Sequence, residues 1–235
     1  RQIRVAQGRR AVSVTTFASF ATLWLLPRLA GFQQQHPDID IRISATDVRV
    51  DMDDPEVDVA LRYDAASAVP PDAERMFGEV LTPAVSPWLV QQASSGQAPP
   101  LRGPADLVGH ALLEEDDHHP SAANLSWLRW LAHKGHTGLA PRRWVYLNYT
   151  HQQVQAALAG QGVALTRMAL VHDQLSRGEL VEPFGPAGRL PVEVLARSHQ
   201  PAWDHTVAQD FLVAVDVVEV ELECLDPLGD APLET

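Results

Sequence analysis

Hydroxyl-bearing residues gather near the start of the chain, where an apolar segment gives way to a helical pattern. Thr15 and Thr16 follow the apolar residues Ala11 to Val14, and Ser19 lies where the helical pattern begins. Such a turn can bind an anion, because its hydroxyls and the free N–H groups of a helix start are hydrogen-bond donors. The same residues can equally serve as a plain helix cap, which needs no ligand.

A second predicted helix start carries similar donors. Thr150 to Gln153 has the T-x-x-Q form of a capping box, with Thr150 as the cap. Two helix starts that face each other across a cleft favour a ligand that carries a carboxylate. Arg62, at the end of an apolar segment, could bind that carboxylate through two hydrogen bonds. It could equally form an internal salt bridge with Asp64 or Asp51, which is the interpretation we favour.

The other chemistry-bearing residues do not form the pattern of a metal, cofactor or catalytic site. The ten histidines include His133 and His136, but Gly135 breaks the helix that would place both on one face. No cysteine joins them, so we interpret them as surface residues. Gly160 to Gly162 follows a predicted helix and precedes a strand, the reverse of the dinucleotide-binding order, and indicates a helix end. We therefore predict no enzyme activity, no cofactor and no metal.

The elements around the first turn form one βαβ unit. A strand over Ala11 to Val14 leads into a run with apolar residues at three- and four-residue steps, from Leu23 to Phe32. Pro37 stops this helix, and a second strand is expected over Ile39 to Ser44. Such a unit builds a parallel sheet, and ligands bind outside the carboxyl ends of its strands.

The rest of the chain continues the alternation of strands and helices. Helices are expected after Pro87, from Asn124 to Gly135, from Thr150 to Gly160 and from Trp203 to Val218. Strands are expected at 57–63, 75–86, 111–114, 144–147, 163–166, 180–181 and 191–197. The order predicts two α/β lobes joined by two extended strands, a hinged clamshell whose cleft is a usual ligand site.

Composition limits the classes of protein that this chain can represent. It has 235 residues, 46% of them apolar, and no window long and apolar enough for a transmembrane helix. The first ten residues are charged and lack the apolar core of a signal peptide. Since the sequence does not begin with Met, we expect a fragment or a processed chain. Cys224 is the only cysteine, which excludes a disulfide framework and fits a reducing, cytoplasmic compartment.

The charge balance argues against direct binding to nucleic acid. The formal net charge is −12, and so acidic a surface repels both DNA and anionic membranes. The one basic cluster is Arg1, Arg4, Arg9 and Arg10. It could be a phosphate-binding arm, but a solvated tail or linker is the interpretation we favour.

Three blocks of sequence carry a resemblance to a known family. They are SVTTFASFATLWLLPRLAGFQQQHPDIDIRIS at 13–44, VDVALRY at 57–63 and QAALAGQGVALT at 155–166. In this order they resemble the effector-binding domain of LysR-type transcriptional regulators, in the branch of the glycine-cleavage activator and the β-lactamase regulator. The likeness extends from Ala11 to about Val213.

The resemblance implies a fold, partners and a domain plan. The fold is α/β, a type 2 periplasmic-binding-protein-like clamshell of two Rossmann-like subdomains joined by two crossover strands. The partners are a small-molecule effector, a second copy in a homodimer or homotetramer, and promoter DNA through a winged helix-turn-helix outside this chain. On this plan residues 1–10 end a linker, 11–86 with 192–218 form subdomain I, 87–191 form subdomain II, and 219–235 form an acidic tail.

The family pattern also selects the residues that we expect to contact the effector. They are Thr15, Thr16, Ser19, Thr46, Asp51, Arg62, Tyr149 and Thr150. The chain departs from that pattern at Asp64, at the acidic run from Asp51 to Glu56, at Arg167 and in the tail beyond Asp216. Asp64 and Arg167 fall on the expected cleft rim, so the family's usual ligands are not carried over.

Two other functions fit the same fold. A secreted solute-binding protein would share the clamshell, and a signal peptide upstream would distinguish it from a regulator with an upstream helix-turn-helix. An enzyme would need a convergent acid–base pair, which the sequence does not indicate. For the regulator we expect a homodimer through the first lobe, because the helices at 23–32 and 203–218 carry more apolar surface than that lobe needs.

Overall fold

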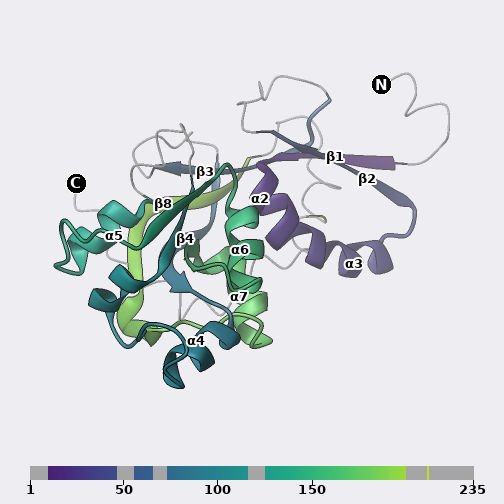
Figure 1. Ribbon diagram of the computed structural model, residues 1–235. Helices are drawn as coiled ribbons and strands as arrows, with labels where there is room; N and C mark the ends of the chain where they lie inside the picture. The colour runs from purple at the N-terminus through teal and green to yellow at the C-terminus, as the bar shows by residue number, and fades with distance from the viewer. Residues whose placement is uncertain (1–9, 47–55, 66–72, 116–124, 200–210, 212–235) are drawn as a thin grey trace. The chain divides into compact units, whose positions relative to one another are not determined.

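The computed structural model describes residues 10–46, 56–65, 73–115, 125–199 and 211 (Figure 1). The chain divides into two compact units, Arg1–Gly78 with Glu193–Thr235 (unit 1) and Glu79–Val192 (unit 2). Two strands, β4 (Glu74–Ala84) and β8 (Leu190–His199), pass from one unit into the other. Both units combine strands with helices, so the predicted α/β class is confirmed. No described helix is long and apolar enough to cross a membrane.

The sheet of unit 1 is built around the first predicted strand. Its strands run in the order β2, β1, β3, β8, with β1 parallel to both neighbours and β3 antiparallel to β8. Val12, Val14 and Ile39 are buried, and the helical segment at 18–35 runs along one side of β1 and β2 in Figure 1. The predicted strands are confirmed, with bounds β1 (Arg10–Thr16), β2 (Ile39–Ala45) and β3 (Val59–Ala65).

The helix after β1 contains a wide turn that the sequence pattern did not predict. It runs through α2 (Ala18–Phe20), a π-helical turn η1 (Ala21–Leu25) and α3 (Leu26–Gln35). Pro27 lacks an N–H and its ring would meet the carbonyl four residues earlier in a regular helix. The π turn accommodates Pro27, since the N–H of Leu26 donates to the carbonyl of Ala21, five residues back.

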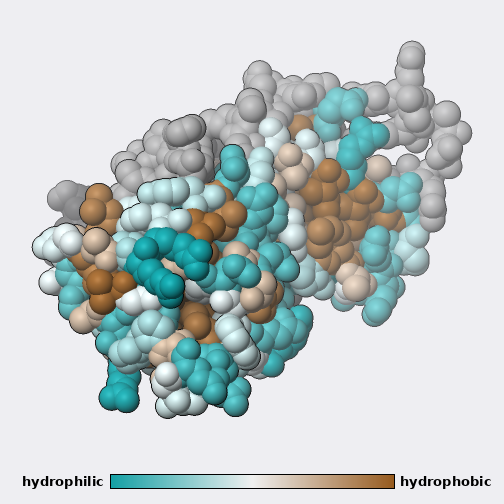
Figure 2. All heavy atoms as spheres, viewed as in Figure 1, coloured by the Kyte–Doolittle hydropathy of each residue, from teal (hydrophilic) through white to brown (hydrophobic). Residues whose placement is uncertain are grey.

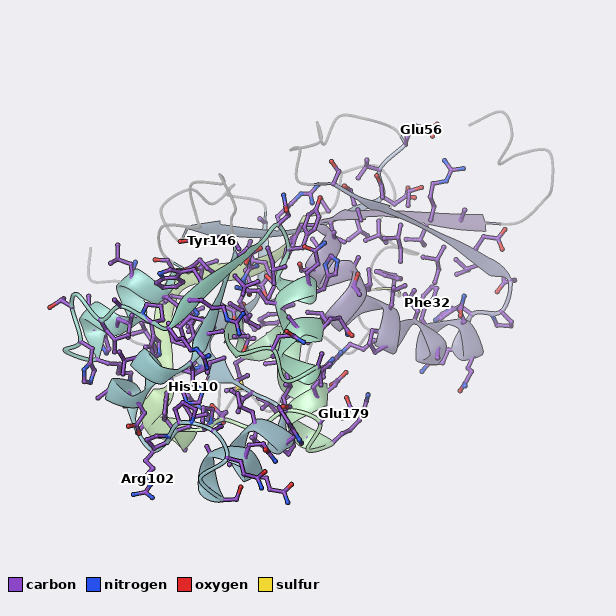
Figure 3. All side chains as sticks on the ribbon, in the orientation of Figure 1. Phe32, Glu56, Arg102, His110, Tyr146 and Glu179 are labelled. Carbon is purple, nitrogen blue, oxygen red and sulfur yellow. The ribbon has the colours of Figure 1, made fainter. Side chains whose placement is uncertain are left out.

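The wide turn decides which apolar row of this helix faces the sheet. Leu25, Leu29 and Phe32, which is labelled in Figure 3, are buried, as the apolar spacing predicts. Leu23, Leu26 and Ala30 also have helical spacing, but only Leu23 is buried, and half of the Leu26 surface is accessible. An aromatic cluster completes this core, in which Trp24 lies 4.7 Å from Phe20 and 5.9 Å from Phe77 between ring centroids.

Unit 2 repeats the same plan with its own strands. Its strands run in the order β4, β7, β5, β6, with β5 parallel to β6 and β7, and β4 antiparallel to β7. The predicted strands are confirmed as β5 (Ala111–Glu115), β6 (Arg143–Leu147) and β7 (Val163–Arg167). The strand predicted at 180–181 is only a single bridge between Val181 and Val85. The helices are α4 (Pro87–Ser94), α5 (Trp127–His133), α6 (Thr150–Leu158), α7 (Met168–Ser176) and short 3-10 turns at Pro104–Gly109 and Gly185–Gly188.

The predicted helix ends agree only partly with the structure. Ser126 caps α5 by accepting from the N–H of Arg129, whereas the predicted cap, Asn124, lies outside the described residues. Gly160 ends α6 with a φ of 73°, which confirms the predicted helix end. The predicted last helix, 203–218, lies outside the described residues except for Phe211, which is buried 5.2 Å from Phe32 between ring centroids.

Close packing between strands explains Gly162. A Cβ atom on this residue would lie 2.4 Å from the carbonyl oxygen of Ala111 at the start of β5. The glycine therefore lets the turn after α6 pass directly against the sheet, and β7 starts at the next residue. The close approach of Gly162 to Ala111 thus places the start of β7, just after α6, against the start of β5.

Candidate functional site

The carboxyl ends of the parallel strands in unit 1 bring together four of the predicted site residues. Arg62 on β3 donates from Nη2 to the hydroxyl of Thr15 on β1 at 2.8 Å. Its Nη1 donates to the carbonyl oxygen of Thr46, just after β2, at 3.1 Å. The N–H of Thr46 in turn donates to the carbonyl oxygen of Thr16 at 2.7 Å. Three adjacent strands thus position one guanidinium group at the edge where ligands of such sheets bind.

The threonines differ in how their hydroxyls are used. Side chains alternate along a strand, so Thr15 and Thr16 lie on opposite faces of the sheet. The hydroxyl of Thr15 accepts from Arg62, whereas the buried hydroxyl of Thr16 has no hydrogen-bond partner among the described residues. Ser19 is also buried, in the first turn of α2. Among the described residues, the buried hydroxyl of Thr16 is therefore left without a hydrogen bond.

The two interpretations of Arg62 are tested only in part. Its hydrogen bonds to Thr15 and Thr46 show that it is tied to neighbouring strand ends. Asp51, one proposed salt-bridge partner and itself a predicted site residue, lies outside the described residues. Both the internal salt bridge and the contact with a ligand carboxylate therefore stay predictions.

The helix start in unit 2 differs from the prediction. Tyr149 is the N-cap of α6, and its ring stacks on His151 at 5.2 Å between centroids. Thr150 is the first helical residue and caps nothing, because its hydroxyl donates to Oε2 of Glu115 at 2.8 Å. The predicted capping box at Thr150 to Gln153 is therefore wrong: an internal carboxylate already occupies the hydroxyl of Thr150.

The sequence pattern did not select Glu115, Arg167 or Gln153 for the site. Nη2 of Arg167, the last residue of β7, lies 3.2 Å from Oε2 of Glu115, the last residue of β5. Gln153, one turn into α6, is buried and donates from Nε2 to the carbonyl of Leu113 at 3.1 Å. The strand-end rule could have identified Glu115, but the predicted strand stopped one residue early, at Glu114.

The neighbouring carboxylate, Glu114, is in a different electrostatic environment. Burial raises the pKa of Glu114 to about 7, opposed by the N–H of Trp127 at 3.2 Å and assisted by the charge of Glu115. Elsewhere in unit 2, burial acts to raise the pKa of Glu182, but hydrogen bonds from Arg189 and Thr82 hold it below its usual value. Among the described residues, no three His, Cys, Asp or Glu side chains are placed to hold a metal ion.

Comparisons with known proteins identify relatives of this chain. The family model described as LysR substrate binding domain matches residues 6–215. The glycine cleavage system transcriptional activator of Escherichia coli (strain K12) is 32% identical over 184 residues, 78% of this chain and 57% of that protein. The transcriptional activator AmpR of Pseudomonas aeruginosa is 32% identical over 177 residues, 75% of this chain and 55% of that protein. These relatives are transcriptional regulators, not enzymes, and the chain spans little more than half of their length.

Solved structures agree with this assignment. The effector domain of AmpR from Pseudomonas aeruginosa superimposes with a TM-score of 0.66 at 27% identity, covering 92% of this chain and 98% of that one. The AmpR effector-binding domain of Citrobacter freundii, at 22% identity, gives a TM-score of 0.64 and supports the fold. The predicted fold class, the α/β fold of these effector domains, is confirmed.

Proposed function

The chain belongs to the LysR substrate-binding domain family, and from this premise we propose that it senses a small carboxylate-bearing effector for a transcriptional regulator. The effector binds at the strand ends of unit 1, where Arg62, Thr15, Thr16 and Thr46 meet. Its presence alters how a helix-turn-helix domain outside this chain engages promoter DNA. The interlobe location and the contacts of Ser19, Asp51, Tyr149 and Thr150 stay predictions from the family pattern.

The anchored guanidinium of Arg62 is the observation that carries this proposal. Hydrogen bonds to Thr15 and Thr46 fix its planar group at the carboxyl ends of β1, β2 and β3. A fixed guanidinium loses less entropy when it binds a carboxylate, and it can do so through two parallel hydrogen bonds. Thr16 follows Thr15 at the same strand end but on the opposite face of the sheet, where its buried hydroxyl has no hydrogen-bond partner among the described residues.

The acidic net charge of this chain supports the proposal that a separate domain binds promoter DNA. The formal net charge of −12 opposes binding to DNA, and the one basic cluster, at residues 1–10, is small beside that acidic excess. We therefore assign promoter binding to a part of the regulator that this chain does not include, and we place the regulator in the cytoplasm. The coding sequence upstream tests this: a secretion signal there would support a solute-binding protein instead.

Exposed apolar side chains support the proposed homodimer. Figure 2 shows apolar residues gathered over α2 and α3, where half of the Leu26 surface is accessible. In unit 2, Trp144 and Tyr146 stack at 6.1 Å on β6, and Tyr146 projects away from the sheet in Figure 3. Apolar patches of this kind mark protein interfaces. Sedimentation of the chain as a monomer at micromolar concentration would contradict the homodimer.

Arg62→Gln in the full-length regulator tests the sensing role. We expect the variant to lose most of its effector-dependent change in transcription, because glutamine cannot pair with a carboxylate as guanidinium does. Promoter binding measured by gel shift should be unchanged. Arg102→Gln is the control, since Arg102 is an exposed arginine of unit 2. Full induction in the Arg62 variant would refute the proposed site.

A further inference from the structure

Strand β6 (Arg143–Leu147) is the outermost of the strands in unit 2. It is last in the strand order and pairs with β5 along its whole length. The N–H and C=O groups of successive residues point to opposite sides of a strand, so β6 directs a row of them away from β5. Among the described residues, no strand pairs with that row. An edge of this kind can accept a further strand from another chain.

The side chains along this edge differ between its two faces. Trp144 and Tyr146 stack on one face at 6.1 Å between ring centroids, and Tyr146 projects from the sheet in Figure 3. Arg143 is exposed on the other face, because side chains alternate along a strand, and Arg142 is exposed just before it. Neither arginine forms an ion pair with any described residue. A strand that matches this edge is therefore acidic on one face and apolar on the other.

The end of the chain contains a segment with that pattern. From Val218 to Cys224 the sequence reads VEVELEC, so glutamates at 219, 221 and 223 alternate with apolar residues. Strict alternation is the pattern of a half-buried strand. From Asp216 to the last residue, the chain has no lysine or arginine to offset its acids. This tail lies outside the described residues, and the sensing function gives it no role.

One way of pairing the tail with β6 matches both faces at once. When the glutamates lie on the face of Arg143, the apolar side chains lie beside Trp144 and Tyr146. Opposite charges and aromatic–aliphatic pairs on neighbouring strands both stabilise a sheet. A shift by one residue would instead place glutamates beside the rings and Val220 beside Arg143. The alternation therefore specifies which face of the tail meets which face of β6.

We propose that residues 218–224 of a second copy add to the edge of β6 as a further strand. Exposed aromatic surface such as that of Trp144 and Tyr146 marks an interface between proteins, which favours another copy as the source of the strand. Each copy has both an edge and a tail, so a two-fold dimer makes the contact twice. This inference rests on the proposed homodimer and gives the acidic tail a role in it.

Charge reversal in two versions of the full chain tests the exchange of tails. One version carries Glu219→Lys, Glu221→Lys and Glu223→Lys, and the other carries Arg142→Glu and Arg143→Glu. Each version alone places like charges on tail and edge, so its dimer dissociation constant, measured by sedimentation, should rise by about tenfold or more. In an equimolar mixture the lysine tail meets the glutamate edge and the glutamate tail meets the arginine edge. Association should therefore return in the mixture.

Two further variants separate strand addition from a general effect of charge. Val220→Glu combined with Glu221→Val keeps the composition and charge of the tail but breaks its alternation, so it should weaken association by a similar factor. Arg102→Glu is the control, since Arg102 is an exposed arginine of unit 2 that lies far from Tyr146 in Figure 3. It should leave association unchanged.

The possible failures point to different parts of the proposal. Full association of the chain with the broken alternation would overturn strand addition. A mixture that stays as weakly associated as its two components would overturn the exchange between copies. Unchanged association in every variant would overturn the role of the tail but leave the homodimer standing, whereas a parent chain that sediments as a monomer would count against both.

Discussion

Replacing Trp130 by alanine should lower the free energy of unfolding by about 3–5 kcal/mol, the usual cost of emptying a buried aromatic site. Trp130 is fully buried on α5, in an edge-to-face contact with Trp127 at 5.4 Å between ring centroids. Its indole Nε1 also donates to the carbonyl oxygen of Gly188, two residues before β8, at 2.7 Å. The loss should therefore affect both the core of unit 2 and the start of a crossover strand.

A matched pair of tryptophans separates the packing from the hydrogen bond. Trp24 in unit 1 is equally buried, but its Nε1 has no hydrogen-bond partner among the described residues. Trp130→Phe should therefore cost about 1–3 kcal/mol more than Trp24→Phe, because only the former leaves a buried carbonyl unpaired. Urea unfolding measures both, and equal costs would show that the indole bond to Gly188 contributes nothing.

The pH dependence of stability should show the effect of Glu114. Burial raises its pKa from 4.5 to about 7, so between these values the folded chain binds more protons than the unfolded one. The stabilisation is fully present below about pH 4.5 and is lost as the pH rises through about 7. A shift of this size corresponds to up to about 3 kcal/mol.

Glu114→Gln should remove the fall in stability that accompanies ionisation of Glu114. The variant should therefore be more stable than the parent chain above about pH 7. Glu182 acts in the opposite direction, since its lowered pKa contributes stability that disappears only at acidic pH. Unfolding titrations between about pH 5 and 9 avoid the acidic range where Glu182 titrates. The exposed Glu179→Gln is the control. An identical fall in stability for parent and Glu114→Gln would contradict this account.

Local sequence signals predicted the elements that position the unit 1 site. Alternating and apolar strands, separated by a helical run that Pro37 ends, were enough to predict β1, β2 and β3, and the strand-end rule then placed Thr15, Thr46 and Arg62 together. The π turn at Pro27 was missed, because the three- and four-residue spacing continues through it. Helix α7 was missed as well, since it begins directly after β7 with no turn residue and no side-chain cap.

The contacts that Thr150 and Arg167 make with Glu115 show why side-chain contacts are harder to predict than helices and strands. The T-x-x-Q pattern at Thr150 predicts a local cap, but a carboxylate 35 residues earlier in the chain takes its hydroxyl instead. Arg167 was noticed only as a departure from the family pattern, and its partner Glu115 lies 52 residues away. Partnerships over such separations depend on strand register, which the pattern of one sequence does not specify.

The most direct test of the sensing function is an amide NMR titration of the chain with a small carboxylate that raises its melting temperature. The account predicts that the largest chemical-shift changes in unit 1 fall at the strand ends, on Thr15, Thr16, Thr46 and Arg62. Arg62→Gln should abolish these changes while Arg102→Gln preserves them. Saturable binding that leaves those four amides unshifted would contradict the account, because the effector would then bind elsewhere.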